Sequence, residues 1–304
     1  ETTQTTASTS NMQGAPGANG GKTEGQRPSG NAGGFMGRAG GAIGFGQSAS
    51  EAKALEKLNI NLTEHQKEQF DRYYEMLVEW NNVMNLTGIT DYDEVNLKHF
   101  TDSLTLVRNI DMNKIDAVID IGTGAGFPGL PIKIAFPHIH VVLLDSLNKR
   151  IKFLNAVIEE LDLADVETLH GRAEDYAKRK EYREQFDLCV SRAVANLATL
   201  SEYCLPYVKK DGVFLPYKSG EIDAEVVQAK KAVTILGGTL REVIKFQLFN
   251  SCFKELFISI VSSSIGLSRA LAVSTRISGI GISRLTLPFT FGPTAIFCIY
   301  ISGA

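Results

Sequence analysis

Three glycines at alternate positions, Gly122, Gly124 and Gly126, follow the short apolar stretch 117–121. Because glycine has no Cβ atom, a turn of this kind allows a ligand to approach the backbone closely. The amide groups of the turn, and of a helix that begins just after it, would then face that ligand. The spacing therefore predicts a buried strand, a ligand-binding turn and a helix, in that order.

A carboxylate follows at the spacing expected of a nucleotide-binding unit. The apolar stretch 141–145 predicts a second buried strand, and it ends at Asp145, about twenty residues after the glycines. An acidic side chain at the tip of this strand is placed to hold both hydroxyls of a ribose. The three glycines and Asp145 together indicate a cofactor that contains a nucleoside, and we assign all four residues to its binding.

The register of the glycines separates two such cofactors. Residues 124–129 fit the dinucleotide pattern G-x-G-x-x-G, which alone is weak evidence for NAD. The alignment that respects the end of the strand is Asp120-x-Gly122-x-Gly124-x-Gly126, which resembles motif I of methyltransferases that use S-adenosylmethionine (SAM). SAM has no pyrophosphate, so the turn needs only to pass close to its methionine and ribose parts. We favour SAM over NAD on these motifs.

Composition narrows the class of protein. The net charge of −3 does not indicate binding of nucleic acid through bulk charge, so such contact would need a local basic patch. The four cysteines lie far apart and form no C-x-x-C pair, which argues against zinc and against a disulfide framework. Residues 285–304 carry no charge, but their prolines make a poor membrane helix. We therefore expect a cytoplasmic protein with no metal and no membrane contact.

The chain divides into four parts. Residues 1–50 are small and polar, with little bulky apolar content, and we expect a disordered low-complexity tail. Residues 51–110 predict an N-terminal helical extension, and residues 111–248 predict the SAM-binding domain. Residues 249–304 form an atypical hydrophobic C-terminal segment, with one strand at 256–261 followed by irregular structure.

Strand and helix patterns alternate from about residue 115, which predicts an α/β fold with a parallel, Rossmann-like sheet and helices on both faces. The predicted strands are 117–121, 141–145, 166–169, 187–191, 212–217 and 239–247. The predicted helices are 129–136, 148–161, 173–181, 196–208 and 222–236. In the helical extension, the capping-box spacing from Thr63 to Gln66 predicts the start of one helix, and Asp91 begins another.

Several local strings occur together in a known order and spacing. They are Glu79-Trp80-Asn81, Met84-Asn85-Leu86-Thr87, Lys98-His99-Phe100-Thr101-Asp102-Ser103-Leu104, Asp120-Ile121-Gly122-Thr123-Gly124-Ala125-Gly126-Phe127-Pro128-Gly129, Leu143-Leu144-Asp145-Ser146-Leu147-Asn148-Lys149-Arg150, Gly171-Arg172-Ala173-Glu174-Asp175 and Val190-Ser191-Arg192-Ala193. With these strings, residues 55–248 resemble the RsmG family, also called GidB, of 16S ribosomal RNA guanine-N7 methyltransferases. The resemblance implies a SAM-dependent methyltransferase sheet with an N-terminal helical extension.

The resemblance also implies a SAM pocket at matching positions. These are Gly122 and Phe127 in the glycine turn, Ala173 and Glu174 after the third strand, and Arg192 after the fourth. For Glu174, an equally good interpretation is an acid that stabilises the first turn of a helix. For Arg192 the alternative is a surface salt bridge, which fits less well with a place at the ligand-facing rim of the sheet.

The implied reaction moves a methyl group from SAM to N7 of a guanine, in 16S rRNA or the small ribosomal subunit. N7 has a lone pair and no proton, so no general base is needed, and we assign no catalytic residue; positioning is the main task. We expect the protein to be a monomer. The candidate RNA contacts are Arg150, Arg172, Arg192 and Lys218 at the rim of the sheet, with Lys98 and His99 in the helical extension. A satisfied, partly buried histidine is an equally good interpretation of His99.

The C-terminal part departs from the family. Where a short turn, a last strand and a tail rich in Lys, Arg and Pro are expected, residues 249–304 are hydrophobic and carry little charge. A basic tail would help to hold RNA phosphates. Two alternatives therefore stay open: a SAM-dependent methyltransferase that acts on another substrate, and a C-terminally damaged, inactive homologue.

Overall fold

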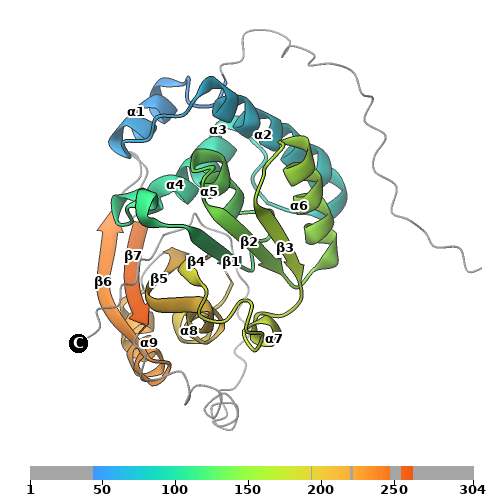
Figure 1. The fold of residues 1–304 in the computed structure, drawn as a ribbon. Coiled ribbons are helices and arrows are strands. Elements are labelled where there is room, and N and C mark those ends of the chain that lie inside the picture. The colour runs from blue at the N-terminus through green and yellow to red at the C-terminus, as the bar shows by residue number, and fades with distance from the viewer. Residues whose placement is uncertain (1–43, 193, 220–221, 247–254, 263–304) are drawn as a thin grey trace, which may run out of the picture. The chain divides into compact units, whose positions relative to one another are not determined.

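A seven-stranded sheet organises the part of the chain that the structure describes (Figure 1). The structure, a computed structural model, describes residues 44–192, 194–219, 222–246 and 255–262. The strands are β1 (Ala117–Ile121), β2 (His140–Asp145), β3 (Val166–His170), β4 (Phe186–Arg192), β5 (Val208–Ser219), β6 (Gly238–Phe246) and β7 (Glu255–Ser262). Their order across the sheet is β3-β2-β1-β4-β5-β7-β6.

The strands run parallel, as predicted from the sequence, except for β7. β1 pairs in parallel with β2 and β4, and β3 and β5 extend the parallel sheet on either side. The expected strand at 256–261 is present as β7, but it runs antiparallel to both β5 and β6, so the expectation of a wholly parallel sheet is wrong. A parallel connection needs a crossover of a dozen or more residues, and residues 247–254 are too few to provide one.

Nine α-helices lie in the described part of the chain. They are α1 (Ala49–Lys57), α2 (Glu64–Met84), α3 (Tyr92–Val95), α4 (Asp102–Leu104), α5 (Gly129–Ala135), α6 (Asn148–Glu160), α7 (Ala173–Tyr176), α8 (Leu197–Cys204) and α9 (Asp223–Ile235). A π-helical turn, Asn96–Thr101, joins α3 to α4. Short 3-10 turns cover Thr105–Arg108, Met112–Lys114 and Leu205–Tyr207.

Two helices are shorter than the sequence predicts. The helix expected over 173–181 ends at Tyr176, and the chain continues in turns whose amides bond three residues back, from Arg179 to Tyr176 and from Tyr182 to Arg179. The helix expected over 196–208 ends at Cys204. A 3-10 turn that contains a proline follows it, and β5 already begins at residue 208, paired with β4.

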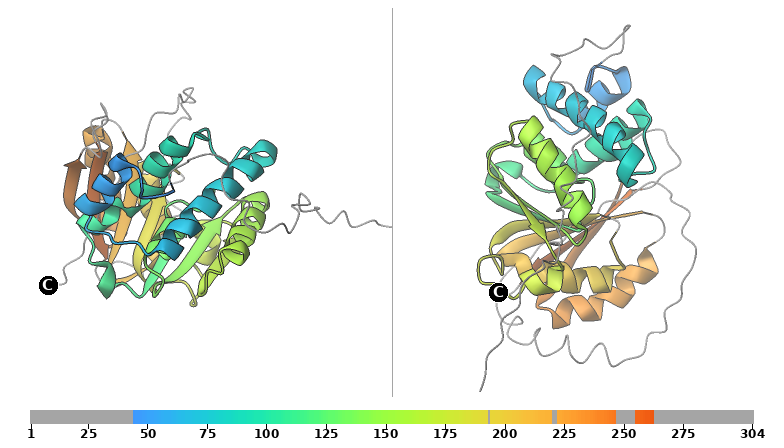
Figure 2. Two further views of the ribbon diagram at one scale, coloured as in Figure 1. Left: turned by 90° about the horizontal axis from the view of Figure 1, so that it is seen from above. Right: turned by 90° about the vertical axis from the view of Figure 1, so that its right-hand side faces the viewer.

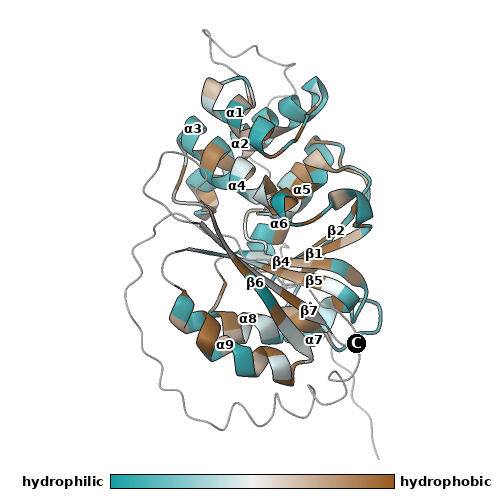
Figure 3. Ribbon diagram, turned by 90° about the vertical axis from the view of Figure 1, so that its left-hand side faces the viewer, coloured by the Kyte–Doolittle hydropathy of each residue, from teal (hydrophilic) through white to brown (hydrophobic). Residues whose placement is uncertain are grey.

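The sheet buries a hydrophobic cluster on each face. Side chains alternate between the faces along a strand, so Val118 contributes to one cluster and its neighbour Ile119 to the other. Figure 2 shows α1 to α6 on one side of the sheet and α8 and α9 on the other, and in Figure 3 brown, hydrophobic residues dominate the central strands between these two layers. Because both faces are covered, most residues of the central strands are apolar.

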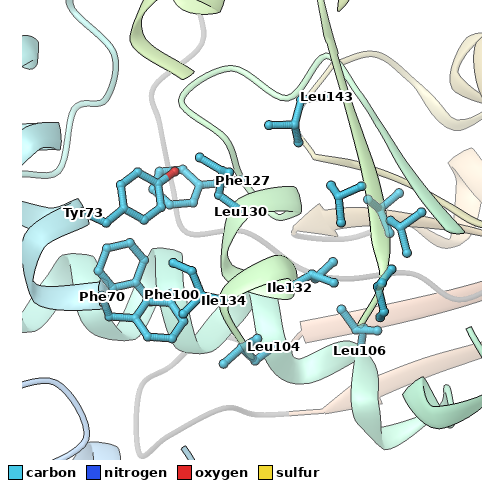
Figure 4. Packing of buried hydrophobic residues seen from close by; sticks show 14 of the residues in the cluster. Phe70, Tyr73, Phe100, Leu104, Leu106, Phe127, Leu130, Ile132, Ile134 and Leu143 are labelled. Atoms are coloured by element: carbon cyan, nitrogen blue, oxygen red, sulfur yellow. The ribbon is translucent and has the colours of Figure 1, made fainter. Parts of the chain in front are cut away.

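The N-terminal helices belong to the same core as the sheet. Thr63 and Gln66 form the predicted capping box at the start of α2. The side chain of Gln66 also donates to the carbonyl oxygens at the end of α5, 2.7 Å from that of Ile134. Phe70 and Tyr73 of α2 are buried beside residues of α5 and the strands (Figure 4). This extension is therefore fixed to the sheet.

The described part of the chain begins before the predicted boundary at residue 50. Phe45 is fully buried, and its ring centroid lies 4.4 Å from that of Phe70 and 5.7 Å from that of Phe100. Its amide donates to a carboxylate oxygen of Asp71 at 3.0 Å. The expected disordered tail is therefore too long at its C-terminal end, because one aromatic residue in a polar stretch suffices to complete a core. Residues 1–43 lie outside the described residues.

Replacing Phe45 tests this boundary. Phe45→Ala should lower the free energy of unfolding by about 3–5 kcal/mol, since it opens a cavity beside the rings of Phe70 and Phe100. Urea denaturation of the full chain measures the change. The matched control is Val83→Ala, at a side chain 76% exposed, which should stay within about 0.5 kcal/mol of the parent. Equal stability of both variants would contradict the burial of Phe45.

Candidate functional site

The carboxyl ends of β1, β2 and β4 meet where the strand order reverses. The chain goes from β1 to β2 and β3 on one side, then returns to β4 on the other side of β1. Open α/β sheets bind ligands in the crevice outside such a switch point. The glycine turn follows β1 here, and the amides of Gly122 and Thr123 donate to the carbonyl oxygen of Leu144 in β2, at 2.8 and 3.1 Å.

A buried carboxylate fixes the glycine turn from beneath. Oδ2 of Asp120, in β1, accepts hydrogen bonds from the hydroxyl of Thr123 at 2.7 Å and from the amide of Gly129 at 2.9 Å. These bonds tie both ends of the turn to one side chain. Burial raises the pKa of Asp120 to about 7, against the opposing effect of these two bonds and of Arg192. Its other oxygen, Oδ1, is buried without a hydrogen-bond partner.

All three predicted glycines of the turn have left-handed backbone conformations, with φ of +72° at Gly122, +63° at Gly124 and +97° at Gly126. L-residues with a side chain are strained in this region. At Gly126 there is also no room, because a Cβ atom would lie 2.6 Å from the Tyr73 hydroxyl and from a methyl group of Leu130. Packing therefore requires glycine at position 126.

The outer side of the turn is open at Gly124. A Cβ atom placed there would meet only the carbonyl oxygen of Gly122, at 4.0 Å. Both glycines are partly exposed, and Val194, which is 41% exposed, stands beside Gly122 at the rim. The space beside the Cα atom is therefore open at Gly124, whereas at Gly122 it is occupied by Val194, whose methyl group would lie 2.6 Å from an added Cβ atom. The contact of both glycines with a cofactor stays a prediction.

Asp145 lies at the predicted tip of β2 but is engaged with its own chain. Its carboxylate accepts from the amides of Gly124 at 3.0 Å and Leu147 at 2.8 Å, and from the guanidinium of Arg150 at 3.1 Å. Its side chain is only 2% exposed. Asp145 thus braces the glycine turn against β2, and its contact with a ribose stays a prediction.

Arg192 ends β4 and reaches over the turn. Its guanidinium carbon lies 4.9 Å from the centre of the Phe127 ring, and Nη1 forms an ion pair of 3.1 Å with Asp102. The two charged side chains are 8% and 2% exposed. The alternative of a surface salt bridge is therefore wrong for Arg192, since the pair is buried at the edge of the site.

His99 completes this side of the site. Its ring stacks on Phe127 with centroids 4.7 Å apart, and Nε2 lies 2.8 Å from the hydroxyl of Thr87. Burial and the nearby charge of Arg192 lower the pKa of His99 to about 3, so the imidazole is neutral at physiological pH. The structure bears out the interpretation of a satisfied, partly buried histidine.

Ala173 and Glu174 lie at the start of α7, directly after β3. The loop that leads to them is joined to β2, because the amide of Gly171 donates to the carbonyl oxygen of Asp145 at 3.1 Å. Ala173 is buried, whereas Glu174 is exposed in the first turn of the helix. The structure thus brings both residues to the same rim as the glycine turn. It leaves open both interpretations of Glu174.

The candidate RNA contacts differ in their exposure. Arg172 is exposed at the rim beside α7, as an RNA contact would require. Arg150 is one-third exposed and paired with Asp145. Lys218 is turned inward, where its ammonium group meets both Glu225 and the carbonyl oxygen of Ala195. The prediction of a solvent-facing contact at Lys218 does not fit, because this internal pair occupies the side chain.

Two features of the site escaped sequence reasoning. One is the hydroxyl of Tyr73, which donates to the carbonyl oxygen of Ala125 inside the glycine turn. Figure 4 shows Tyr73 and Phe127 side by side, with ring centroids 5.4 Å apart. The other is Asp102 as the partner of Arg192. Helical periodicity predicts that Tyr73 is a core residue. No local pattern predicts its hydrogen bond to Ala125, or the ion pair between Asp102 and Arg192, because the partners are far apart in the sequence.

Within the described ranges, the structure contains no cluster of three or more His, Cys, Asp or Glu side chains suited to a metal ion. Among the helices of those same ranges, none combines the length and the apolar character needed to cross a bilayer.

Comparison with known proteins decides the family. A family model described as "rRNA small subunit methyltransferase G" (GidB) matches residues 66–251. The chain belongs to this family. It is 51% identical over 208 residues to the ribosomal RNA small subunit methyltransferase G of Lachnoclostridium phytofermentans, a match that covers 68% of this chain and 86% of that protein. The resemblance predicted from the local strings is confirmed.

Other known proteins are similar as well. The ribosomal RNA small subunit methyltransferase G of Bacillus subtilis is 50% identical over 194 residues, covering 64% of this chain and 81% of that protein. Among solved structures, the O-methyltransferase from Bacillus cereus in complex with SAH aligns over 70% of this chain and 97% of its own, with 16% identity and a TM-score of 0.47. The predicted α/β methyltransferase fold is confirmed by the strand order and by membership of the family.

Two glycine variants test whether the turn is open at Gly124 and tightly packed at Gly126. Gly124→Ala should cost about 1–2 kcal/mol of folding stability, the strain of a left-handed alanine. Gly126→Ala carries the same strain and also forces its Cβ atom against Tyr73 and Leu130, which should cost about 1–3 kcal/mol more. Urea denaturation of both variants measures the difference. A Gly124→Ala variant that is the less stable of the two would contradict the open side of the turn.

The raised pKa of Asp120 predicts a pH dependence of folding. The native state keeps the Asp120 proton up to about pH 7, whereas the unfolded chain releases it near pH 4. The native state binds more protons in this window, so the contribution of Asp120 to stability is full below pH 4 and falls as the pH rises towards 7, by up to about 1.4 kcal/mol per pH unit.

Asp120→Asn isolates this contribution. Its free energy of unfolding should fall less steeply between pH 4 and 7 than that of the parent, measured by urea denaturation at each pH. The parent also contains Asp102, whose pKa is raised by burial and lowered by the paired Arg192, but this group is present in both proteins and drops out of the comparison. Parallel pH profiles would show that Asp120 is ionised throughout.

Proposed function

We propose that this chain transfers the methyl group of SAM to N7 of a guanine in 16S rRNA, acting on the rRNA or on the small ribosomal subunit. The observation that carries the proposal is the glycine turn at the switch point of the sheet, with its open side at Gly124, in a chain of the small-subunit rRNA methyltransferase G family. We further propose that the protein acts as a monomer in the cytoplasm, where an rRNA substrate would be met.

The residues around the turn suit SAM. A close approach of the ligand to the backbone is sterically free at Gly124, and a side chain at this position would fill the same space. We assign Gly122, Gly124, Gly126 and Phe127 to the cofactor side of the site. When bound, SAM would supply a methyl group on a positively charged sulfur atom.

Three other elements complete the proposed pocket. Asp145 at the tip of β2 is the candidate for the ribose, which would compete with Arg150 for the carboxylate. Ala173 and Glu174 at the start of α7 are our candidates for contact with the adenine edge, and Arg192, beside Phe127, is our candidate for the adjacent side of the pocket. All of these residues lie at the carboxyl edge of the parallel strands, which supports a single ligand site.

The chemistry asks for positioning rather than proton transfer. The guanine N7 lone pair forms the new bond to the methyl carbon while the sulfur–carbon bond breaks, and no proton moves at N7. The chain therefore has to hold acceptor and donor in line and limit their motion. A rigid turn, fixed by Asp120 below and by Asp145 at its side, suits this task.

RNA would approach over the rim. Arg172 is exposed beside α7, and Lys149 is exposed at the start of α6. Because the net charge of the chain is −3, contact with RNA phosphates would depend on such exposed cations. The described part of the chain supplies these cations without residues 263–304, which lie outside it.

The test is methyl transfer to small ribosomal subunits, and to rRNA, that lack the modification, followed by mass analysis of the nucleosides. The parent should yield 7-methylguanosine. Gly124→Val, which fills the open side, and Arg192→Ala should each lower the rate at least about tenfold. Gly88→Val is the matched control, because a side chain there meets nothing within 4 Å, and it should keep the parent rate.

Each outcome has a distinct meaning. Parent rates in both Gly124→Val and Arg192→Ala would refute the assigned pocket. Binding of SAM, measured by calorimetry, without methylation of either RNA substrate would favour a different acceptor. A methylated nucleoside other than 7-methylguanosine would refute N7 as the acceptor atom.

A further inference from the structure

A buried ion pair links the helical extension to the site, and the glycine motif does not account for it. Arg192, at the end of β4, lies 3.1 Å from the carboxylate of Asp102, the first residue of α4. The two residues are 90 positions apart in the sequence, and both side chains are almost fully buried. Asp102 is thus one of the residues through which the extension contacts the site.

A local irregularity in the helical segment aims several groups at Arg192. The segment from α3 to α4 contains the π-helical turn Asn96–Thr101, and such turns are frequent at functional sites because they shift the register of the side chains that follow. Nη1 of Arg192 lies 3.4 Å from the carbonyl oxygen of Lys98, and Nη2 lies 3.5 Å from Nδ1 of His99. Asp102 follows directly after this turn.

Among the groups in direct contact with the guanidinium, Asp102 is the anion. His99 is neutral, because burial and Arg192 itself hold its pKa near 3. Phe127 offers only the face of its ring, with the guanidinium carbon 4.9 Å from its centre. Asp102 therefore sets the direction in which the charge of Arg192 is held.

Stability alone gives a weak reason for such a pair. Moving two charges out of water costs several kcal/mol per ion, and a well-packed apolar pair of similar volume is often as stable. One oxygen of Asp102, Oδ1, is in addition buried without a hydrogen-bond partner, a further cost. A charge held at this cost beside a ligand site points to a role in binding.

We infer that Asp102 is a positioning residue: its ion pair holds the guanidinium of Arg192 against Phe127, beside the glycine turn, in the orientation that binds the cofactor. This inference rests on the proposed function, in which Arg192 contacts SAM. Asp102 itself touches no substrate, and its effect passes through Arg192.

The first test is the affinity for SAM, measured by calorimetry on the full chain. Asp102→Asn keeps the shape of the side chain and removes its charge, and it should raise the Kd for SAM about tenfold. The matched control is Asp187→Asn. Asp187, in β4, is also buried and paired with a cation, Lys209. It lies beside the first residue of β1, away from the glycine turn, and accepts a hydrogen bond from the amide of Ala117. Its replacement should leave the Kd unchanged.

A double-mutant cycle with Arg192→Ala separates positioning from a merely structural role. If Asp102 acts through Arg192, adding Asp102→Asn to Arg192→Ala should change the Kd by less than about twofold. In methylation assays, Asp102→Asn should raise the KM for SAM more than it lowers kcat. Asp102→Glu keeps the charge and should retain at least part of the affinity that Asp102→Asn loses. Asp102→Ala, which also removes the charge, replaces Asp102→Asn in the cycle if the latter does not fold.

The outcomes distinguish this inference from the proposed function. A normal Kd in Arg192→Ala would refute both, since Arg192 would then not contact SAM. A raised Kd in Arg192→Ala with a normal Kd in Asp102→Asn would refute the positioning role alone. Additive losses in the double variant would show that Asp102 acts on the fold and not through Arg192, and would also overturn the inference.

Discussion

The site depends on one buried carboxylate. Asp120 holds the hydroxyl of Thr123 and the amide of Gly129 with the same oxygen, and thereby closes the chain from β1 to α5 into a tight turn. Burying an ionisable group is costly, and hydrogen bonds to the carboxylate offset part of that cost. At Gly129 even a Cβ atom would collide with Leu143 and crowd Asp120, so the start of α5 can lie this close only with glycine. The open face of the turn is a consequence of this closure.

A column of aromatic rings makes the helical extension part of the same site. The Phe127 ring stacks with that of Tyr73, at 5.4 Å, and with that of His99, at 4.7 Å, and the guanidinium carbon of Arg192 lies 4.9 Å from its centre. Tyr73 also donates to the carbonyl oxygen of Ala125 within the turn. The extension therefore forms a wall of the site, and its strings in the sequence belong with the glycine motif for a physical reason.

Features that depend on neighbouring residues were predictable from the sequence, and those that depend on distant partners were not. The strands, the glycine turn, the capping box at Thr63 and the acid at the tip of β2 follow from local spacing, and the structure has them in place. The reversed direction of β7, the burial of Phe45 and the pairing of Asp102 with Arg192 each require a contact across the fold. No periodicity encodes such contacts, which is why the helical extension appeared separable in sequence but shares one core with the sheet.

The central claim is that the glycine turn is the cofactor site, and a crystal structure of the full chain with S-adenosylhomocysteine, the demethylated product, tests it most directly. The account predicts ligand density against the backbone of Gly122 and Gly124, with the nucleoside towards Asp145 and Glu174, and Arg192 still paired with Asp102. Density elsewhere on the sheet, or a turn that stays empty at a concentration where calorimetry shows binding, would contradict it.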